Sequence, residues 1–365
     1  MSLSIGIVGL PCVGKSTIFN LITNSSVEAG GYAFSTTEAH LGVVAIPDER
    51  LNVLSDISAS DKVVSATIEF VDIPSLVSGS SKGEGMGNKF LSNIREVSAL
   101  AYVVRFFEDE NMPHVMGSLN PLRDIDVVNT ELLLADLAMA ENIVANQERR
   151  VKKDKSEAPR LEVYKKIYKH LEDIQPLRTL KLDEDEQALR KGVDFLTDKK
   201  IIYVLNISEN MLGQEDTSEE IKKVVDYAKE ENDEVIIISA KLEAELSKLE
   251  EEDRKELMND MGIKEAGLPK FIKKSFSLLD LQTFLTTGKK ETRAWTIKKH
   301  TTAQKAAGVI HSDLERGFIR ANIVNYDDFV IYKSMPKAKE AAKLRQEGKE
   351  YIMQDGDIVE FLFNV

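Results

Sequence analysis

A glycine-rich stretch near the start of the chain limits the folds that this sequence can adopt. Gly9, Gly14, Lys15 and Ser16 match the pattern G-x-x-x-x-G-K-[ST], with an apolar run before them and a helical pattern after them. In that setting, backbone N–H groups and a helix N-terminus face the phosphates of a nucleotide. The motif therefore predicts an α/β domain whose phosphate loop joins the first strand to the first helix.

Length and composition set further limits. The chain has 365 residues, which is enough for two or three domains with separate cores. Its one cysteine, Cys12, excludes an internal disulfide. We find no secretory leader pattern and no apolar run near the roughly 20 residues of a membrane helix, so we expect a cytoplasmic protein without a membrane partner. The net charge of -13 argues against a general nucleic-acid-binding surface, although a local basic patch is compatible with it.

Short apolar, β-branched runs alternate with helical patterns in the first third of the chain. They lie at 3–10, 66–74 and 98–107, and similar runs return at 199–208 and 233–240. This alternation is typical of a mostly parallel sheet covered by helices. The fold class predicted for this part is therefore an α/β P-loop nucleotide-binding domain.

Composition divides the chain into three predicted domains. Residues 126–197 have apolar side chains at helical spacing and a break near Pro159, so we expect a helical hairpin or short coiled coil. Strand patterns resume after it, so this segment reads as an insertion into a nucleotide-binding domain of residues 1–125 and 198–280. Residues 281–365 combine strand and helix patterns with an Asp-Gly turn signal, which indicates a small α+β domain.

The phosphate loop supplies the first candidate ligands. Lys15 can reach the β and γ oxygens of a nucleotide, and the Ser16 hydroxyl can bind Mg²⁺. Asp72 ends an apolar run, where a carboxylate can support the same ion, although an isolated aspartate there is more often a turn or cap residue. Thr36 and Thr37 lie in a polar loop between these motifs, and one of their hydroxyls, in our prediction that of Thr36, completes the metal shell when a γ-phosphate is bound. The predicted nucleotide contacts in the phosphate loop are Pro11, Cys12, Val13, Gly14, Lys15, Ser16 and Thr17.

Two short polar stretches follow later strands. One runs from Asn206 to Glu209 and the other from Ser239 to Lys241. The carboxyl ends of parallel strands meet at the edge where ligands bind in open α/β sheets, so both stretches are candidates for contacting the base. Each of them alone is more typical of a cap or a turn. The predicted base contacts are Asn206, Ile207, Glu209, Ser239, Ala240 and Lys241.

Together these motifs resemble the YchF-type Obg-like ATPases, which belong to the translation-factor class of P-loop proteins. The likeness covers nearly the whole chain and includes the stretches GLPCVGKSTIFN, DIPSLVSGSSKGEGMGNKFL, YVLNISE, ISAKLEAEL and RAWTIKKHTTAQKAAGVIHSD. It implies a nucleotide domain, a helical insertion and a C-terminal TGS domain of the ubiquitin-like β-grasp type. It also implies ATP and ADP as ligands and the ribosome or a ribosomal subunit as partner, with RNA contact through the insertion or the TGS domain.

The base-binding stretch has its own reason to favour ATP. In the usual Asn-Lys-x-Asp motif, the Asp carboxylate accepts hydrogen bonds from guanine and the Lys packs against the base. Ile207 and Glu209 occupy those two places here. Guanine specificity is therefore weakened, while the 6-amino group of adenine can donate to Asn206 or to a nearby backbone carbonyl.

Hydrolysis needs a positioned water, which Ras-type proteins obtain from a Gln soon after the Asp-x-x-Gly motif. Leu76 holds the matching position and cannot orient water. The resemblance offers His114 instead, although a lone loop histidine is usually a solvated or capping residue. We therefore predict Lys15 and His114 as the catalytic residues.

Two positions depart from the family pattern. Ser75 stands where the family usually has Gly, so the backbone loses some Gly-only conformations and switching could be altered. Cys12 stands where the family often has an Asn that related proteins link to K⁺. Because a thiol is a poor ligand for that hard cation, a role for K⁺ is doubtful, whereas Mg²⁺ is expected.

The predicted function is that of an Mg²⁺-dependent P-loop ATPase that hydrolyses ATP slowly and acts as a nucleotide-controlled switch on the ribosome. Two alternatives stay open. One is a conventional GTPase, and the other is a binding module that ATP stabilises with little hydrolysis. Nucleotide competition separates the first alternative from the prediction, and single-turnover hydrolysis separates the second.

Overall fold

The computed structural model describes residues 3–30, 41–75, 85–190, 192–213 and 217–364. The described chain forms two compact units, which we treat separately. The first takes in residues 3–21, 41–42 and, apart from the gaps, 70–268; the second takes in residues 22–30, 43–69 and 269–364.

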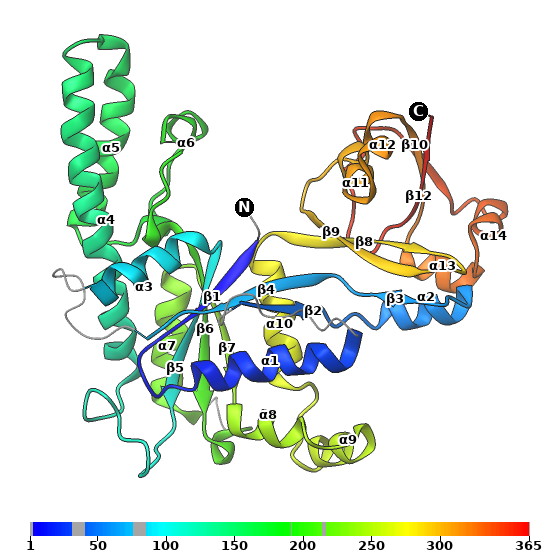
Figure 1. Ribbon diagram of the computed structural model, residues 1–365, viewed down its shortest axis with the longest axis horizontal. Coiled ribbons are helices and arrows are strands. Elements are labelled where there is room, and N and C mark those ends of the chain that lie inside the picture. Colours follow the sequence, from blue (N-terminus) through cyan, green and yellow to red (C-terminus); the bar gives the residue numbers. More distant parts are fainter. Residues whose placement is uncertain (1–2, 31–40, 76–84, 191, 214–216, 365) are drawn as a thin grey trace. The chain divides into compact units, whose positions relative to one another are not determined.

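The first sheet has six strands in the order β2-β4-β1-β5-β6-β7 (Figure 1). The pairs β1–β5, β5–β6 and β6–β7 are parallel, and β1 and β5 are buried along their whole length. Continuous apolar runs are what a sheet covered on both faces requires. The strands are β1 (Ser4–Val8), β2 (Leu41–Ala45), β4 (Thr67–Asp72), β5 (Ala99–Phe106), β6 (Lys200–Ile207) and β7 (Glu234–Ile238).

Helices follow most of these strands. The polar stretch after β7 leads directly into a helix, because the Ser239 hydroxyl accepts the backbone N–H of Leu242 as an N-cap. The helices outside the insertion are α1 (Lys15–Gly30), α3 (Gly85–Glu96), α7 (Glu219–Glu230), α8 (Ala240–Leu246), α9 (Glu251–Asp260) and α10 (Gly267–Leu278), with a short 3₁₀ turn at Glu209–Met211.

Two long helices form the arm that the helical pattern predicts, and they lie side by side in Figure 1. Asn120 caps α4 by accepting from the N–H of Arg123, and the chain reverses through a short 3₁₀ turn before Pro159 enters the first turn of α5. Buried Asp136 anchors the base of the arm through three hydrogen bonds from Leu196 and Thr197. The elements are α4 (Pro121–Val151), 3₁₀ turns at Lys155–Glu157, Leu177–Thr179 and Leu196–Asp198, α5 (Ala158–Glu172) and α6 (Glu184–Arg190).

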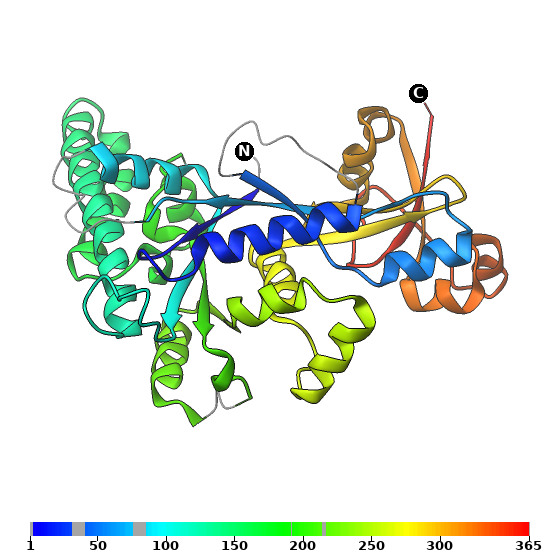
Figure 2. The ribbon, with the colours of Figure 1, turned by 60° about the horizontal axis from the view of Figure 1, so that its bottom comes forward.

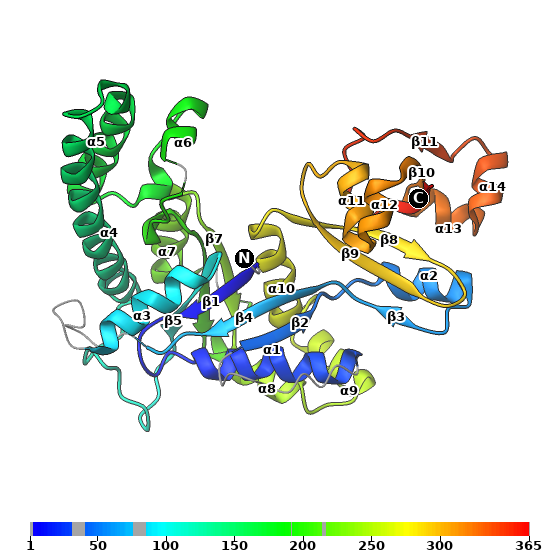
Figure 3. The same ribbon diagram turned by 45° about the horizontal axis from the view of Figure 1, so that its top comes forward.

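The second unit contains a sheet in the order β11-β10-β12-β8-β9-β3, whose core includes Phe284, Ile323 and Phe361. Helices α11 and α12 lie next to each other and pack on its strands (Figure 3). The strands are β3 (Val63–Val64), β8 (Leu281–Thr287), β9 (Thr292–Lys298), β10 (Phe318–Val324), β11 (Arg345–Glu347) and β12 (Ile358–Phe363). The helices are α2 (Arg50–Ser58), α11 (Ala303–Ile310), α12 (Ser312–Arg316), α13 (Tyr326–Tyr332) and α14 (Met335–Glu340).

An early segment joins this C-terminal sheet, which the sequence did not indicate. Strand β3 pairs in parallel with β9, and α2 packs beside α13 (Figure 2). Arg50 donates to Asp48, Asp355 and Thr283, so one guanidinium ties α2 to the turn before β12. Among the described helices, none has the length and apolar character needed to span a membrane.

Candidate functional site

The phosphate loop lies between β1 and α1, as its glycine pattern predicts. Gly9 and Gly14 both have positive φ angles, of 147° and 99°. A Cβ on Gly9 would lie 2.5 Å from the carbonyl oxygen of Val103, and one on Gly14 would collide with the Asn206 amide. Cys12 also has a positive φ, 61°, which is uncommon for a residue with a side chain. The loop is therefore a tight turn held against the central strands.

Lys15 begins α1 with its side chain folded back over the loop. Its Nζ donates to the carbonyl oxygen of Leu10 at 2.9 Å and to the hydroxyl of Ser75. Burial lowers the pKa of Lys15 to about 8, although Asp72 and Cys12 act in the opposite direction. An anionic phosphate in the loop would compensate this partly desolvated ammonium.

Ser16 and Asp72 come together at the first turn of α1. The Ser16 hydroxyl donates to Asp72 Oδ2 at 3.1 Å, whereas Asp72 Oδ1 is buried without a hydrogen-bond partner among the described residues. A hydroxyl beside a carboxylate oxygen that lacks a partner is a donor set that suits a hard cation such as Mg²⁺. Thr36, the third predicted ligand, lies outside the described residues.

Asn206 connects the phosphate loop to the stretch after β7. Its side chain is 3% exposed; Nδ2 donates to the Val13 carbonyl at 2.9 Å, and Oδ1 accepts from the Ala240 N–H at 3.0 Å. Both ends of the amide are thus occupied by backbone groups. The Asn206 side chain is thus one of the contacts that bring the two predicted base-binding stretches together.

The remaining predicted base contacts divide into a buried and an open group. Ile207 is buried in the core of the sheet, so only its backbone can contact a base. Glu209 Oε2 pairs with the ammonium of Lys241 at 2.8 Å, which fixes this carboxylate beside the stretch after β7. Its other oxygen, Oε1, is buried without a partner among the described residues. In the phosphate loop, Val13 is buried and Thr17 is exposed.

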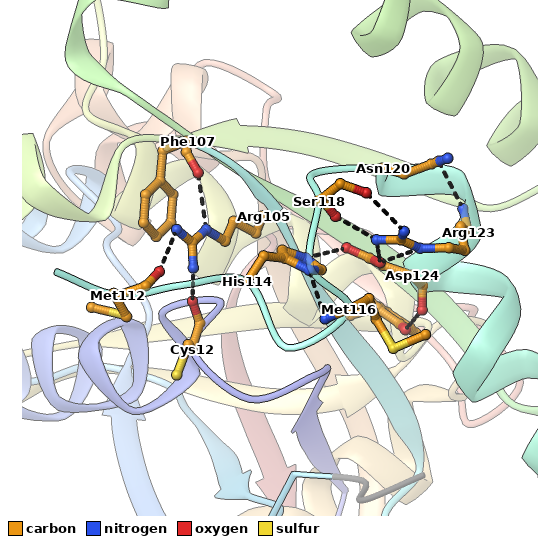
Figure 4. Close-up of polar contacts among 11 residues, drawn as sticks. Cys12, Arg105, Phe107, Met112, His114, Met116, Ser118, Asn120, Arg123 and Asp124 are labelled. Atoms are coloured by element: carbon orange, nitrogen blue, oxygen red, sulfur yellow. Dashed lines mark hydrogen bonds and ion pairs between the residues drawn. The ribbon is translucent and has the colours of Figure 1, made fainter. Parts of the chain in front are cut away.

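His114 lies in the loop between β5 and α4, and its ring points toward Asp124 (Figure 4). The His114 Nε2 lies 2.7 Å from Asp124 Oδ2, and Nδ1 accepts the N–H of Met116 at 3.1 Å. The side chains of His114 and Asp124 are only 7% and 3% exposed. Arg123 also contacts Asp124, through Oδ1. His114 is thus held by a buried carboxylate in this structure, and both ring nitrogens take part in hydrogen bonds.

Arg105 was missed by the sequence analysis. It lies next to the last residue of β5 and is buried, with its guanidinium donating to the carbonyl groups of Cys12, Phe107 and Met112 (Figure 4). The one signal available was an arginine within the apolar run 98–107. A cavity of about 250 Å³ is lined by Arg105, Phe107, Glu108, His114 and Ser118, among others.

Comparisons with known proteins show which family this chain is similar to. A family model described as "50S ribosome-binding GTPase" matches residues 4–147, and the model YchF-GTPase_C, described as "Protein of unknown function (DUF933)", matches residues 281–364. The "Ribosome-binding ATPase YchF" of Bacillus subtilis is 46% identical over 366 residues, covering 100% of both chains. The chain belongs to the YchF family. A relative of the same name from Pasteurella multocida is also 46% identical over the full length.

A solved YchF structure supports the same assignment. The Schizosaccharomyces pombe YchF GTPase superimposes with a TM-score of 0.88 at 34% identity, covering 99% of this chain and 98% of the other. These matches confirm the predicted family and the predicted fold class of an α/β P-loop domain with a helical insertion and a C-terminal α+β domain. The roles of the individual site residues stay predictions, and Leu76, like Thr36, falls outside the described residues.

Proposed function

We propose that this YchF-family chain is an Mg²⁺-dependent ATPase that works on the ribosome. The observation that supports it most is the phosphate loop, where Lys15, Ser16 and Asp72 meet at one end of α1. Full-length relatives at 46% identity are named ribosome-binding ATPases. A P-loop of this kind binds triphosphates through its backbone N–H groups, its lysine and a metal-binding hydroxyl.

In this proposal each loop residue has a defined task. Lys15 contacts the β and γ oxygens of ATP, while Ser16 and Asp72 hold Mg²⁺ directly or through water, with Thr36 as the further predicted ligand. Bound Mg²⁺ supplies charge neutralisation at those oxygens. Asn206 keeps the Val13 carbonyl turned away from the phosphates, so that the loop presents its N–H groups to them.

We also propose that this chain hydrolyses ATP slowly and acts as a nucleotide-controlled switch. The position that usually carries a water-orienting Gln is Leu76, and the proposed replacement, His114, is held by Asp124. Hydrolysis then requires His114 to leave this carboxylate, which an activating partner can bring about. Such a requirement would keep the intrinsic rate of ATP hydrolysis low. Whether ATP or ADP is bound would then depend on whether the partner is present.

The base site supports ATP over GTP. Glu209 Oε1 is a buried acceptor without a partner among the described residues, and the preference for adenine rests on Ile207 and Glu209, which replace the lysine and aspartate that bind guanine in the usual motif. We expect ATP to outcompete GTP in a competition titration with Mg²⁺. Because Ile207 still replaces the lysine, Glu209→Asp should restore GTP binding only in part. Lys241→Ala is the matched control for the ion pair that holds Glu209.

A conventional GTPase is the second candidate, since the Schizosaccharomyces pombe relative is named a GTPase. The same titration decides between the two. GTP binding at least about tenfold more tightly than ATP would exclude the base-site proposal, because a tenfold ratio is about 1.4 kcal/mol of specificity.

For the ribosome contact we propose the tip of the helical arm. Five cations cluster there on exposed positions in a chain whose net charge is -13: Arg149, Arg150, Lys152, Lys153 and Lys155. The turn between the helices is fixed by buried Gln147, whose Nε2 donates to the Glu157 carboxylate at 2.5 Å. A rigid basic tip of this kind matches the phosphate backbone of RNA.

Charge reversal tests this arm. Replacing Arg149 and Arg150 by Glu should weaken ribosome binding by about tenfold or more and should flatten its salt dependence, because fewer counterions are released. The matched control reverses Lys222 and Lys223, two neighbouring exposed cations on α7. Cosedimentation with ribosomes over a series of salt concentrations measures both quantities. Equal losses in the two double variants would contradict the proposal.

A further inference from the structure

Two successive carbonyl groups of the phosphate loop are held by two neighbouring strands. The carbonyl of Cys12 accepts from Arg105 NH1 at 3.2 Å, and the carbonyl of Val13 accepts from Asn206 Nδ2 at 2.9 Å. Arg105 and Asn206 are register partners at the ends of β5 and β6. The back of the phosphate loop therefore rests on one pair of buried polar side chains.

Each member of this pair also reaches a second loop. Asn206 accepts from the N–H of Ala240 in the stretch after β7. Arg105 NH2 donates to the Met112 carbonyl at 2.9 Å, two residues before His114. Asn206 thus joins the phosphate loop to the predicted base site. Arg105 joins the phosphate loop to the loop that holds His114 (Figure 4).

Arg105 holds the two loops through their carbonyl groups, and an arginine suits this task better than a structural ion pair would. Its side chain is 3% exposed and lies in no ion pair among the described residues, so carbonyl groups satisfy its charge. The guanidinium also stacks on Phe107, 4.5 Å from the ring centre. A planar fork with five donors can hold three carbonyl groups in fixed directions, which a lysine ammonium on its flexible stem does poorly.

We propose that Arg105 is a positioning residue that couples the conformation of the phosphate loop to the position of His114. Cys12 adopts a left-handed conformation, and Arg105 holds the carbonyl that this conformation presents. A hydrogen bond to that carbonyl polarises the peptide group and strengthens the Val13 N–H as a donor to phosphate. Nucleotide binding at this peptide then changes the position of Met112, because the same guanidinium holds both carbonyl groups. The inference rests on the proposed ATPase function.

Hydrogen exchange tests the coupling without relying on hydrolysis. In the parent protein, ADP and a non-hydrolysable ATP analogue should change the exchange of residues 107–118, which include the N–H of Met116 that donates to His114. In Arg105→Lys the change should vanish even at nucleotide concentrations that saturate the variant, because a lysine ammonium cannot hold three carbonyl groups in fixed directions. Arg123→Lys is the matched control, because Arg123 contacts Asp124 and Ser118 but has no contact with the phosphate loop among the described residues. That variant should keep the nucleotide-dependent change.

A double-mutant cycle with His114→Ala supplies the catalytic readout. Arg105→Lys should slow single-turnover ATP hydrolysis by about tenfold in the parent and leave the His114→Ala rate unchanged, since coupled residues are not additive. An equal fall in both backgrounds would overturn the proposal. So would a parent protein that binds ADP with no change in exchange at residues 107–118, a result that does not require any variant to fold. Failure to bind ATP or ADP at all would instead refute the proposed function.

Discussion

Replacing Lys15 with alanine is expected to raise the Kd for ATP by about 100-fold or more while leaving the fold intact. Lys15 is the main side-chain charge in reach of the β and γ oxygens, and charge-assisted hydrogen bonds to phosphate are the strong ones. A 100-fold loss is about 2.7 kcal/mol, which is within the range for one or two such bonds. Isothermal titration with ATP and Mg²⁺ measures the change.

The fold should tolerate this substitution. Lys15 makes two hydrogen bonds, to Leu10 and Ser75, but its lowered pKa shows that burial costs the charged side chain part of its solvation. Thermal unfolding of the variant should therefore stay close to that of the parent. Lys248→Ala, which removes an exposed lysine, is the matched control for affinity. If ATP binds Lys15→Ala as tightly as the parent, the phosphate-loop assignment is wrong.

The second large effect concerns His114. His114→Ala should slow ATP hydrolysis by about 10²-fold, the usual range for a positioned acid–base group, while ATP affinity stays nearly unchanged. That combination marks the loss of an interaction made only in the transition state. The rate is measured in single turnover at saturating ATP with ribosomes present, because the ring has to leave Asp124 before it can meet water.

Asp124→Asn is the control that separates catalysis from packing. It removes the charge that holds the ring but keeps the imidazole, so hydrolysis should stay within about tenfold of the parent. His114→Ala, in contrast, leaves the Asp124 carboxylate with Arg123 as its remaining side-chain partner among the described residues. If His114→Ala hydrolyses ATP at the parental rate with ribosomes present, His114 is only a ligand of Asp124, and another group orients the water.

Local motifs predicted the nucleotide-binding part of the fold well. The phosphate loop was readable because two glycines and a lysine at fixed spacing leave few conformations, and positive φ angles at Gly9 and Gly14 bear this out. Strands β1, β5, β6 and β7 were readable because each carries an apolar run, whereas β2 was not predicted. The helical arm followed from its spacing, although its turn comes before Pro159, which lies in the first turn of α5 rather than ending α4.

Long-range pairings could not be predicted from such patterns. Strand β3 has only two residues, and its partner β9 lies more than 200 positions later, so no local signal marks the pair. The same holds for Arg105, whose partner Cys12 is 93 positions away. Asn206 was predicted as a base contact, but the structure shows its amide bound to two backbone groups that only the folded sheet brings together.

Single-turnover phosphate release measures whether this chain hydrolyses ATP and whether ribosomes accelerate that hydrolysis. Excess protein is mixed with γ-labelled ATP or GTP and Mg²⁺, with and without ribosomes, using Lys15→Ala as the blank. We expect slow release from ATP by the parent alone, faster release with ribosomes, and none above background from the blank. Release from GTP but not from ATP would favour the conventional GTPase. No release from either nucleotide with ribosomes present would contradict the claim that this chain is an ATPase.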